Sequence, residues 1–161
     1  MTLTEKDSQY LWHPYTQHKT SQTPIAITKA EGALLWDENG KEYIDAIASW
    51  WVNPFGHSNK IIADAVYKQL TTLEHVLFGG FTHEPAVKVA EKLMEILPEN
   101  QQKIFFSDIG STAVEVAIKV ALQYFFNKNE KRTTIIAFEN AFHGDTFAAM
   151  AASGISFYTQ A

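Results

Sequence analysis

The feature that most constrains the fold is a strand, turn, helix and strand pattern in the last third of the chain. Residues 103–107 read as a short strand, residues 112–127 have helical periodicity, and residues 133–138 form an almost wholly apolar strand. A nearly continuous apolar strand is typical of a parallel sheet that is buried on both faces. The pattern therefore predicts a βαβ unit of an α/β protein. Because one such unit makes an incomplete sheet, we expect this chain to be the front part of a longer α/β enzyme.

The preceding two thirds predict an arm, a hairpin and two helices. Pro14 and Pro24 interrupt regular structure, so we interpret residues 1–23 as an arm. Short strands at 25–28, 33–36 and 41–45 surround a turn at 37–40, which indicates a hairpin. A loop at 46–57 precedes helices at about 58–73, with Ser58 as N-cap, and about 84–97, with Pro85 in the first turn.

Composition excludes several classes of protein. The net charge of −5 argues against a nucleic-acid partner, and no basic cluster marks a membrane surface. The chain of 161 residues has no cysteine, which removes disulfides, thiolate zinc sites and a cysteine nucleophile. No metal site is expected from the six histidines, because their spacing fits no ligand motif. Neither a signal peptide nor an apolar run of about 20 residues is visible, so we expect a cytoplasmic protein.

The strongest chemical signal is the turn at 107–112, just before the predicted helix. Gly110 permits close backbone approach, and Ser111 and Thr112 offer hydroxyl groups at the helix start. The free N–H groups and positive dipole end of a helix N-terminus bind phosphate well. This turn therefore predicts a phosphate site. The alternative is that Ser111 serves only as an N-cap.

A second candidate site follows the apolar strand at 133–138. Ligands of open α/β sheets bind beyond the carboxyl ends of strands, and His143 and Asp145 lie in a loop just after this one. The alternative is a locally hydrogen-bonded turn. Four tryptophans in the first third, Trp12, Trp36, Trp50 and Trp51, indicate either a pocket wall or simple core packing.

Several stretches make the chain resemble a known family. They are Trp12-His13-Pro14-Tyr15-Thr16, Glu31-Gly32, Ser49-Trp50-Trp51, the segment 75–83, the segment 110–117 and Phe142-His143-Gly144-Asp145-Thr146. With these motifs the chain resembles the class III aminotransferases of pyridoxal-phosphate fold type I, from about residue 10 to 153. Within that family, the His-Pro-Tyr-Thr arm and the Trp-Trp pair resemble the biotin-synthesis branch.

The resemblance implies a fold, a cofactor and a reaction. Residues 1–57 would form the arm and hairpin segment, which is part of a small domain. Residues 58–161 would begin the large cofactor-binding α/β domain. The cofactor would be pyridoxal 5'-phosphate, and the enzyme a cytoplasmic homodimer. It would transfer an amino group from S-adenosylmethionine to 8-amino-7-oxononanoate, giving 7,8-diaminononanoate.

The resemblance also implies roles for individual residues. Gly110 and Ser111 would hold the cofactor phosphate, Phe142 would stack on the pyridine ring, and Asp145 would support the cofactor loop. Trp50 and Tyr15 would line the substrate pocket. The family's Schiff-base lysine lies downstream of the matched region, so we expect no catalytic residue in this chain and no activity from it alone.

One departure from the branch keeps alternatives open. The stacking position is commonly tyrosine in the biotin branch, whereas this chain has Phe142. Other class III members have phenylalanine there, so a different ω-amino acid transaminase is an alternative. A non-catalytic scaffold fragment is another.

Overall fold

The computed structural model describes residues 1–154, and the chain divides into two compact units, Met1–Thr82 and His83–Ala161. The predicted boundary between residues 57 and 58 concerns the domains of a complete enzyme, and it stays a prediction. Within the part of the chain that is described, no helix is long and apolar enough to cross a membrane.

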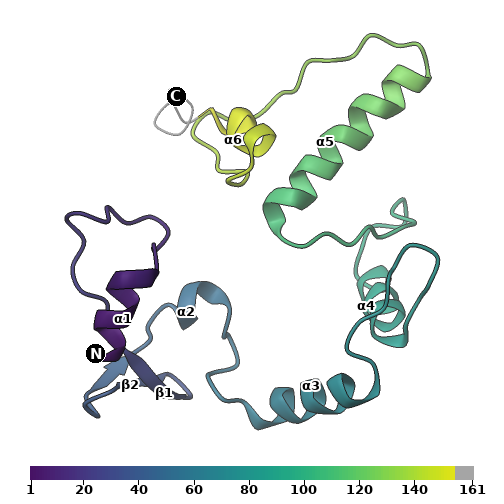
Figure 1. Ribbon diagram of the computed structural model, residues 1–161. Helices are drawn as coiled ribbons and strands as arrows, with labels where there is room; N and C mark the ends of the chain where they lie inside the picture. Colours follow the sequence, from purple (N-terminus) through teal and green to yellow (C-terminus); the bar gives the residue numbers. More distant parts are fainter. Residues whose placement is uncertain (155–161) are drawn as a thin grey trace. The chain divides into compact units, whose positions relative to one another are not determined.

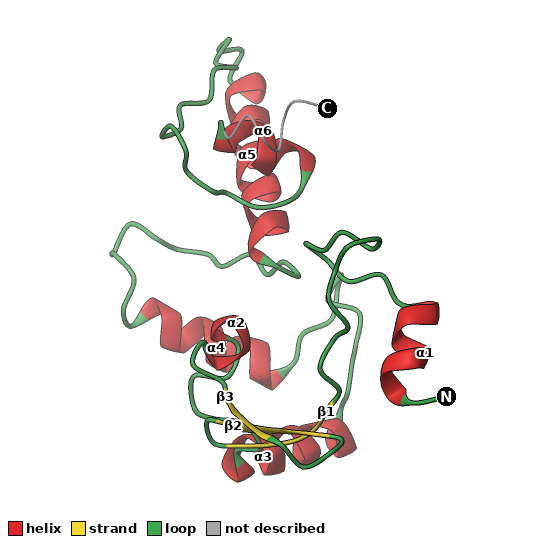
Figure 2. Cartoon of the chain, turned by 90° about the vertical axis from the view of Figure 1, so that its left-hand side faces the viewer, coloured by secondary structure: helices red, strands yellow, loops and turns green. Residues whose placement is uncertain are grey.

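The first unit begins with helix α1 (Leu3–Tyr10) and a three-stranded antiparallel sheet, β1-β2-β3 (Figures 1 and 2). The strands are β1 (Ile27–Glu31), β2 (Leu34–Asp37) and β3 (Glu42–Ile44). The turn between β2 and β3 forms because Asp37 Oδ1 accepts the N–H groups of Asn39 and Lys41, both at 2.9 Å. The predicted hairpin is thus confirmed, with strand ends shifted by a few residues. The arm is helical at α1, which the sequence analysis did not expect.

Two further helices complete this unit, α2 (Ala48–Trp51) and α3 (Lys60–Thr72). The predicted helix at 58–73 is confirmed as α3, but Ser58 is not its N-cap. Asn59 has that role, since its side chain accepts the N–H groups of Ile61 and Ile62. Ser58 instead donates its hydroxyl to the carbonyl of Ala30 at 2.6 Å.

The second unit contains α4 (Glu84–Met94), α5 (Gly110–Asn127) and α6 (Phe147–Ser153). The two helices predicted at 84–97 and 112–127 are confirmed as α4 and α5. Helix α5 begins two residues earlier than predicted, so Gly110 and Ser111 lie inside its first turn. Helices α5 and α6 contact each other.

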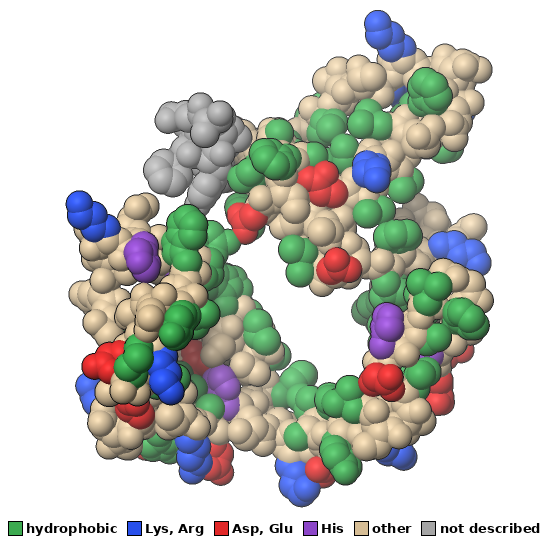
Figure 3. Space-filling view, in the orientation of Figure 1, with side chains coloured by type: hydrophobic (Ala, Val, Ile, Leu, Met, Phe, Trp, Pro, Cys, Tyr) green, Lys and Arg blue, Asp and Glu red, His purple; other side chains and the backbone are tan. Residues whose placement is uncertain are grey.

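The predicted strands at 103–107 and 133–138 are not formed in the described chain, which was an error of the sequence analysis. Each segment lacks a neighbouring strand to supply backbone hydrogen bonds, and a parallel strand needs such neighbours. Their apolar side chains are accordingly exposed, for example Ile136 (94%) and Phe138 (85%). Figure 3 shows hydrophobic side chains at the surface of both units. Among residues 1–154, only Gly144, Ala149 and Ser153 are buried.

Candidate functional site

The first candidate site is the N-terminus of α5. Its N-cap residue is Ile109, which has no polar side chain to cap the free N–H groups of the first turn. The Thr112 hydroxyl accepts the N–H of Ile109 at 3.2 Å and lies 2.6 Å from the Ser107 hydroxyl, so it stabilises the turn instead. The helix thus presents uncapped donors and its positive dipole end. Ser111 is not the N-cap, so the alternative interpretation of this residue is wrong.

The loop at 142–146 lies directly against this helix start. The backbone N–H of Asp145 donates to Ser111 Oγ at 3.0 Å, across 34 residues of sequence. Gly144 has φ +131°, and a Cβ atom there would lie 2.8 Å from Ser111 Cα and nearer still to its hydroxyl oxygen. Only glycine permits this approach. The structure therefore brings the two glycine-containing motifs together.

A second contact fastens the same loop to α5. Glu115 Oε1 accepts the N–H of Ala148 at 2.8 Å, in the first turn of α6. The Thr146 hydroxyl and this N–H hold the pKa of the Glu115 carboxyl below its ordinary value, although partial desolvation opposes them. Ser111 and Glu115 are four residues apart and share one face of α5. The loop is thus held at two points of a single helix.

The loop also contains polar groups suited to a ligand. The N–H of His143 donates to Ser153 Oγ at 3.0 Å, so the alternative of a purely local turn is wrong. His143 Nε2 is buried and has no hydrogen-bond partner among the described residues. Phe142 is 61% exposed. The uncapped α5 N-terminus and the Ser111 hydroxyl fit a phosphate group, and the exposed Phe142 ring in the adjoining loop offers a stacking surface for an aromatic one.

We expect the Glu115 contact to depend on pH. Because the pKa is lowered by folding, the carboxylate stabilises the fold above the ordinary value of 4.5 and loses this effect as the pH falls through the lowered pKa. In a full-length protein that carries this chain, Glu115→Gln should lower the melting temperature at pH 7. The variant should also lose less stability than the parent as the pH falls from 7 to below the lowered pKa of Glu115.

The measurement is a melting curve at each pH, and its control is the exposed Glu91 of α4, changed in the same way. Parallel curves for the parent and Glu115→Gln would contradict the assignment.

The second candidate site lies in the first unit and consists of aromatic rings. Tyr15 and Trp50 stack with ring centroids 5.9 Å apart at 24°, and Trp50 meets Trp51 edge-on at 6.1 Å and 89°. Tyr15 is 73% exposed and Trp50 is 62% exposed, so these rings form an open wall rather than a core. The prediction that Tyr15 and Trp50 act together is consistent with this contact. Their role toward a substrate stays a prediction.

The backbone beneath this wall is unusual. All four residues of α2 have positive φ, between 46° and 67°, so the turn is left-handed. A left-handed conformation costs about 1–2 kcal/mol for each residue with a Cβ atom. Other contacts must therefore stabilise it.

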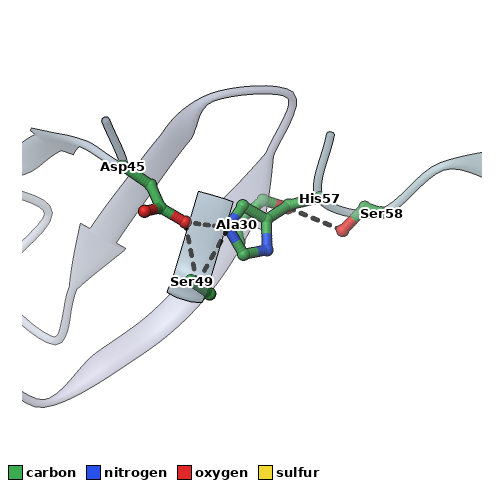
Figure 4. Close-up of polar contacts among 5 residues, drawn as sticks. All are labelled: Ala30, Asp45, Ser49, His57 and Ser58. Carbon is green, nitrogen blue, oxygen red and sulfur yellow. Dashed lines mark hydrogen bonds and ion pairs between the residues drawn. The ribbon is translucent and has the colours of Figure 1, made fainter. Parts of the chain in front are cut away.

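A polar cluster that the sequence analysis missed adjoins this turn. The Asp45 carboxylate accepts the Ser49 hydroxyl and the Nε2–H of His57, both at 2.7 Å (Figure 4). No local pattern marks this cluster, because Asp45 and His57 are twelve residues apart on either side of a loop. Glu115 was also missed, although its spacing from Ser111 on a mainly apolar helix was a usable signal. No cluster able to hold a metal occurs among residues 1–154.

Comparison with known proteins identifies the family to which this chain belongs. Residues 15–160 match the family described as Aminotransferase class-III, so the chain belongs to the class III aminotransferases. This confirms the resemblance and the expected fold class, the N-terminal part of an α/β transferase.

Particular relatives narrow the comparison. The chain is 51% identical over 141 residues to the adenosylmethionine-8-amino-7-oxononanoate aminotransferase of Synechococcus elongatus, covering 88% of this chain and 33% of that protein. It is 43% identical over 159 residues to the enzyme of the same name from Staphylococcus aureus, covering 95% and 35%. The chain thus spans about a third of the length of these curated relatives.

Solved structures of aminotransferases are also similar to this chain. The crystal structure of adenosylmethionine-8-amino-7-oxononanoate aminotransferase from Methanocaldococcus jannaschii has a TM-score of 0.91 and 39% identity, covering 98% of this chain and 37% of that one. An omega transaminase from Pseudomonas jessenii, in complex with PMP, has a TM-score of 0.90 and 32% identity, covering 99% and 36%.

Proposed function

We propose that this chain is the N-terminal third of a pyridoxal-phosphate aminotransferase of biotin synthesis. The enzyme would move an amino group from S-adenosylmethionine to 8-amino-7-oxononanoate and so produce 7,8-diaminononanoate. One observation carries the proposal: the 142–146 loop closes on the uncapped N-terminus of α5 through the Asp145–Ser111 hydrogen bond. The names of the relatives support the choice of substrates.

The residues of the second unit would bind the cofactor. The N–H groups of Gly110 and Ser111 would donate to its phosphate, aided by the helix dipole. Because Ser111 Oγ accepts the N–H of Asp145, its own O–H proton can point outward and donate to a phosphate oxygen. Phe142 would stack on the pyridine ring, and Asp145 would support the loop. When bound, pyridoxal phosphate supplies an electron sink for amino transfer.

The residues of the first unit would contact the substrates. Tyr15 and Trp50 offer exposed, stacked rings, and such a wall buries apolar surface of a long aliphatic chain and excludes water. Neither ring carries a charge, so the wall suits both an amino donor and a ketone acceptor. The wall would orient both substrates but move no proton.

Assembly and location complete the proposal. We propose a cytoplasmic homodimer. The many exposed apolar side chains support this, because such side chains are usually covered by the rest of the protein or by a second subunit. Sedimentation of the full-length protein at micromolar concentration tests this, and a monomer would contradict it.

A second candidate function is that of another class III ω-amino acid transaminase. Phe142 favours it, because the biotin branch commonly has tyrosine at this stacking position. The deciding assay compares S-adenosylmethionine with simple ω-amino acids as donors. Turnover with ω-amino acids alone would favour this second candidate.

Replacing Trp50 tests the substrate role directly. In the full-length enzyme, Trp50→Ala should raise the Michaelis constants for both substrates about tenfold, which corresponds to about 1.4 kcal/mol of lost contact with each substrate. The absorption spectrum of bound cofactor should stay unchanged. The exposed Trp12, at 81%, provides a matched control as Trp12→Ala. Loss of cofactor with unchanged substrate constants would reverse the assignment.

A further inference from the structure

We propose that Asp45, Ser49 and His57 are positioning residues, which hold the left-handed turn of α2 and thereby keep the Trp50 ring on Tyr15. This inference rests on the proposed function, because it assigns these three residues to the substrate-facing wall. They would touch no substrate. Their effect would reach the substrate only through Trp50.

The first argument is the backbone of the turn. Four successive residues with side chains have left-handed φ values, although none is a glycine. Such a conformation persists only when surrounding contacts determine it, and strained segments of this kind concentrate at functional sites. The two tryptophans at the end of the turn owe their direction to it. A right-handed turn would send the Trp50 ring elsewhere, away from Tyr15.

The second argument is the polar cluster at the start of the turn. The Asp45 carboxylate accepts the Ser49 hydroxyl at 2.7 Å, and the N–H of Ser49 contributes a further hydrogen bond. These bonds, together with the His57 ring, hold the pKa of Asp45 far below its ordinary value. The carboxylate therefore stays charged and caps the N–H of Ser49 in the turn. Its side chain is only 5% exposed in a chain whose other side chains are mostly open to solvent.

The third argument is that His57 connects the cluster to the sheet. Its backbone exchanges two hydrogen bonds with Gly32, at 2.8 and 3.1 Å, next to the turn between β1 and β2. Gly56 packs against Gly32, where a Cβ atom would lie 3.1 Å from Gly32 Cα. Ser58, which follows His57 in the chain, donates its hydroxyl to the carbonyl of Ala30 in β1 (Figure 4). The His57 ring therefore ties Asp45 to the most regular part of this unit.

The geometry excludes a nucleophilic role for this serine, histidine and aspartate. In a catalytic triad the two nitrogens of the histidine contact different partners: one accepts the proton of the serine hydroxyl, and the other donates its N–H to the aspartate. Here the same atom, His57 Nε2, lies 2.7 Å from Asp45 and 3.4 Å from Ser49 Oγ. The serine hydroxyl also donates to the same carboxylate oxygen. The cluster is built to hold a structure, and not to activate Ser49.

The test is a double-mutant cycle in the full-length enzyme. Asp45→Asn should raise the Michaelis constants for both substrates about tenfold, as expected for a lost charge-assisted hydrogen bond, with kcat changed less than about twofold. On the Trp50→Ala background, the same substitution should add nothing further. Asp64→Asn is the matched control, because Asp64 pairs with Lys60 on the exposed face of α3.

Two further variants protect the test against misfolding. Ser49→Ala removes one hydroxyl only and should raise the same constants in the same direction. His57→Gln keeps an N–H donor and should retain more substrate affinity than His57→Ala. A purely structural role would not produce this rescue together with the non-additivity.

The outcomes separate the inference from the proposed function. Additive effects of Asp45→Asn and Trp50→Ala would overturn the inference and leave the substrate role of Trp50 intact. The inference would also be overturned if the Michaelis constants were unchanged in both Asp45→Asn and Ser49→Ala but raised in Trp50→Ala. The substrate role of Trp50 would again stay intact. Unchanged constants in Trp50→Ala itself would overturn the proposed substrate wall, and the inference with it.

Discussion

Gly144→Ala is expected to weaken pyridoxal-phosphate binding by about 100-fold or more in the full-length enzyme. At φ +131° a side chain is strained, and the added Cβ atom would lie 2.8 Å from the Cα atom of Ser111. That neighbour is backbone and cannot turn aside. The loop must therefore move away from α5, which breaks the hydrogen bond from Asp145 to Ser111. The N–H groups of Gly110 and Ser111, which are proposed to bind the phosphate, would then no longer lie next to the loop. Titration of the apoenzyme with cofactor measures the effect.

Gly154→Ala is the matched control for this substitution. Gly154 also has positive φ, +65°, but among residues 1–154, its chain neighbour aside, no atom lies within 4 Å of the Cβ position that alanine would add. The control thus introduces a Cβ atom at a positive φ without the collision, at the milder strain of the left-handed helical region. Equal losses in the two variants would show that strain, and not contact with Ser111, explains the result. Full cofactor affinity in Gly144→Ala would contradict the proposed site.

Ser111→Ala is expected to weaken cofactor binding about tenfold to a hundredfold. A hydrogen bond to a charged group contributes roughly 1.5–3 kcal/mol, and the phosphate would lose one such donor. The same change removes the acceptor for the N–H of Asp145, so the loop should also loosen. The dissociation constant of pyridoxal phosphate, measured on the full-length enzyme, gives the first effect. The melting temperature of the apoenzyme gives the second.

Ser107→Ala separates the two effects. Its hydroxyl lies 2.6 Å from Thr112 Oγ1 in the same turn, but it is not proposed to contact phosphate. It should lower the melting temperature while changing the dissociation constant much less than Ser111→Ala. A normal dissociation constant in Ser111→Ala would show that Ser111 only holds the loop.

The elements predicted correctly from the sequence are those that local chemistry determines. The hairpin follows from the acceptor at Asp37 and the turn after it, and α4 follows from Pro85 and an apolar stripe. The prediction of strands at 103–107 and 133–138 was wrong for the described chain, because a parallel strand forms only when its neighbours are present. Periodicity within a segment contains no information about those neighbours.

In the candidate sites, too, the features that local sequence determines could be predicted, and those that depend on tertiary contacts could not. Gly110 and Ser111 could be found because a glycine, a serine and a helix start adjoin in the sequence. The left-handed turn could not, because α2 contains no glycine and its conformation depends on Asp45 and His57. Their twelve-residue separation leaves no periodic signal. The contact of Gly144 with Ser111 likewise depends on tertiary structure.

The double attachment of the loop to α5 has a consequence for how this region tolerates change in length. Ser111 and Glu115 contact Asp145 and Ala148, so one helical turn sets the spacing of both attachments. Inserting or deleting a single residue between Ser111 and Glu115 would rotate one about 100° around the helix axis relative to the other. Ser111 and Glu115 could then no longer face the loop together. Relatives of this chain should therefore vary in residue type between these two positions, yet preserve the number of residues that separates them.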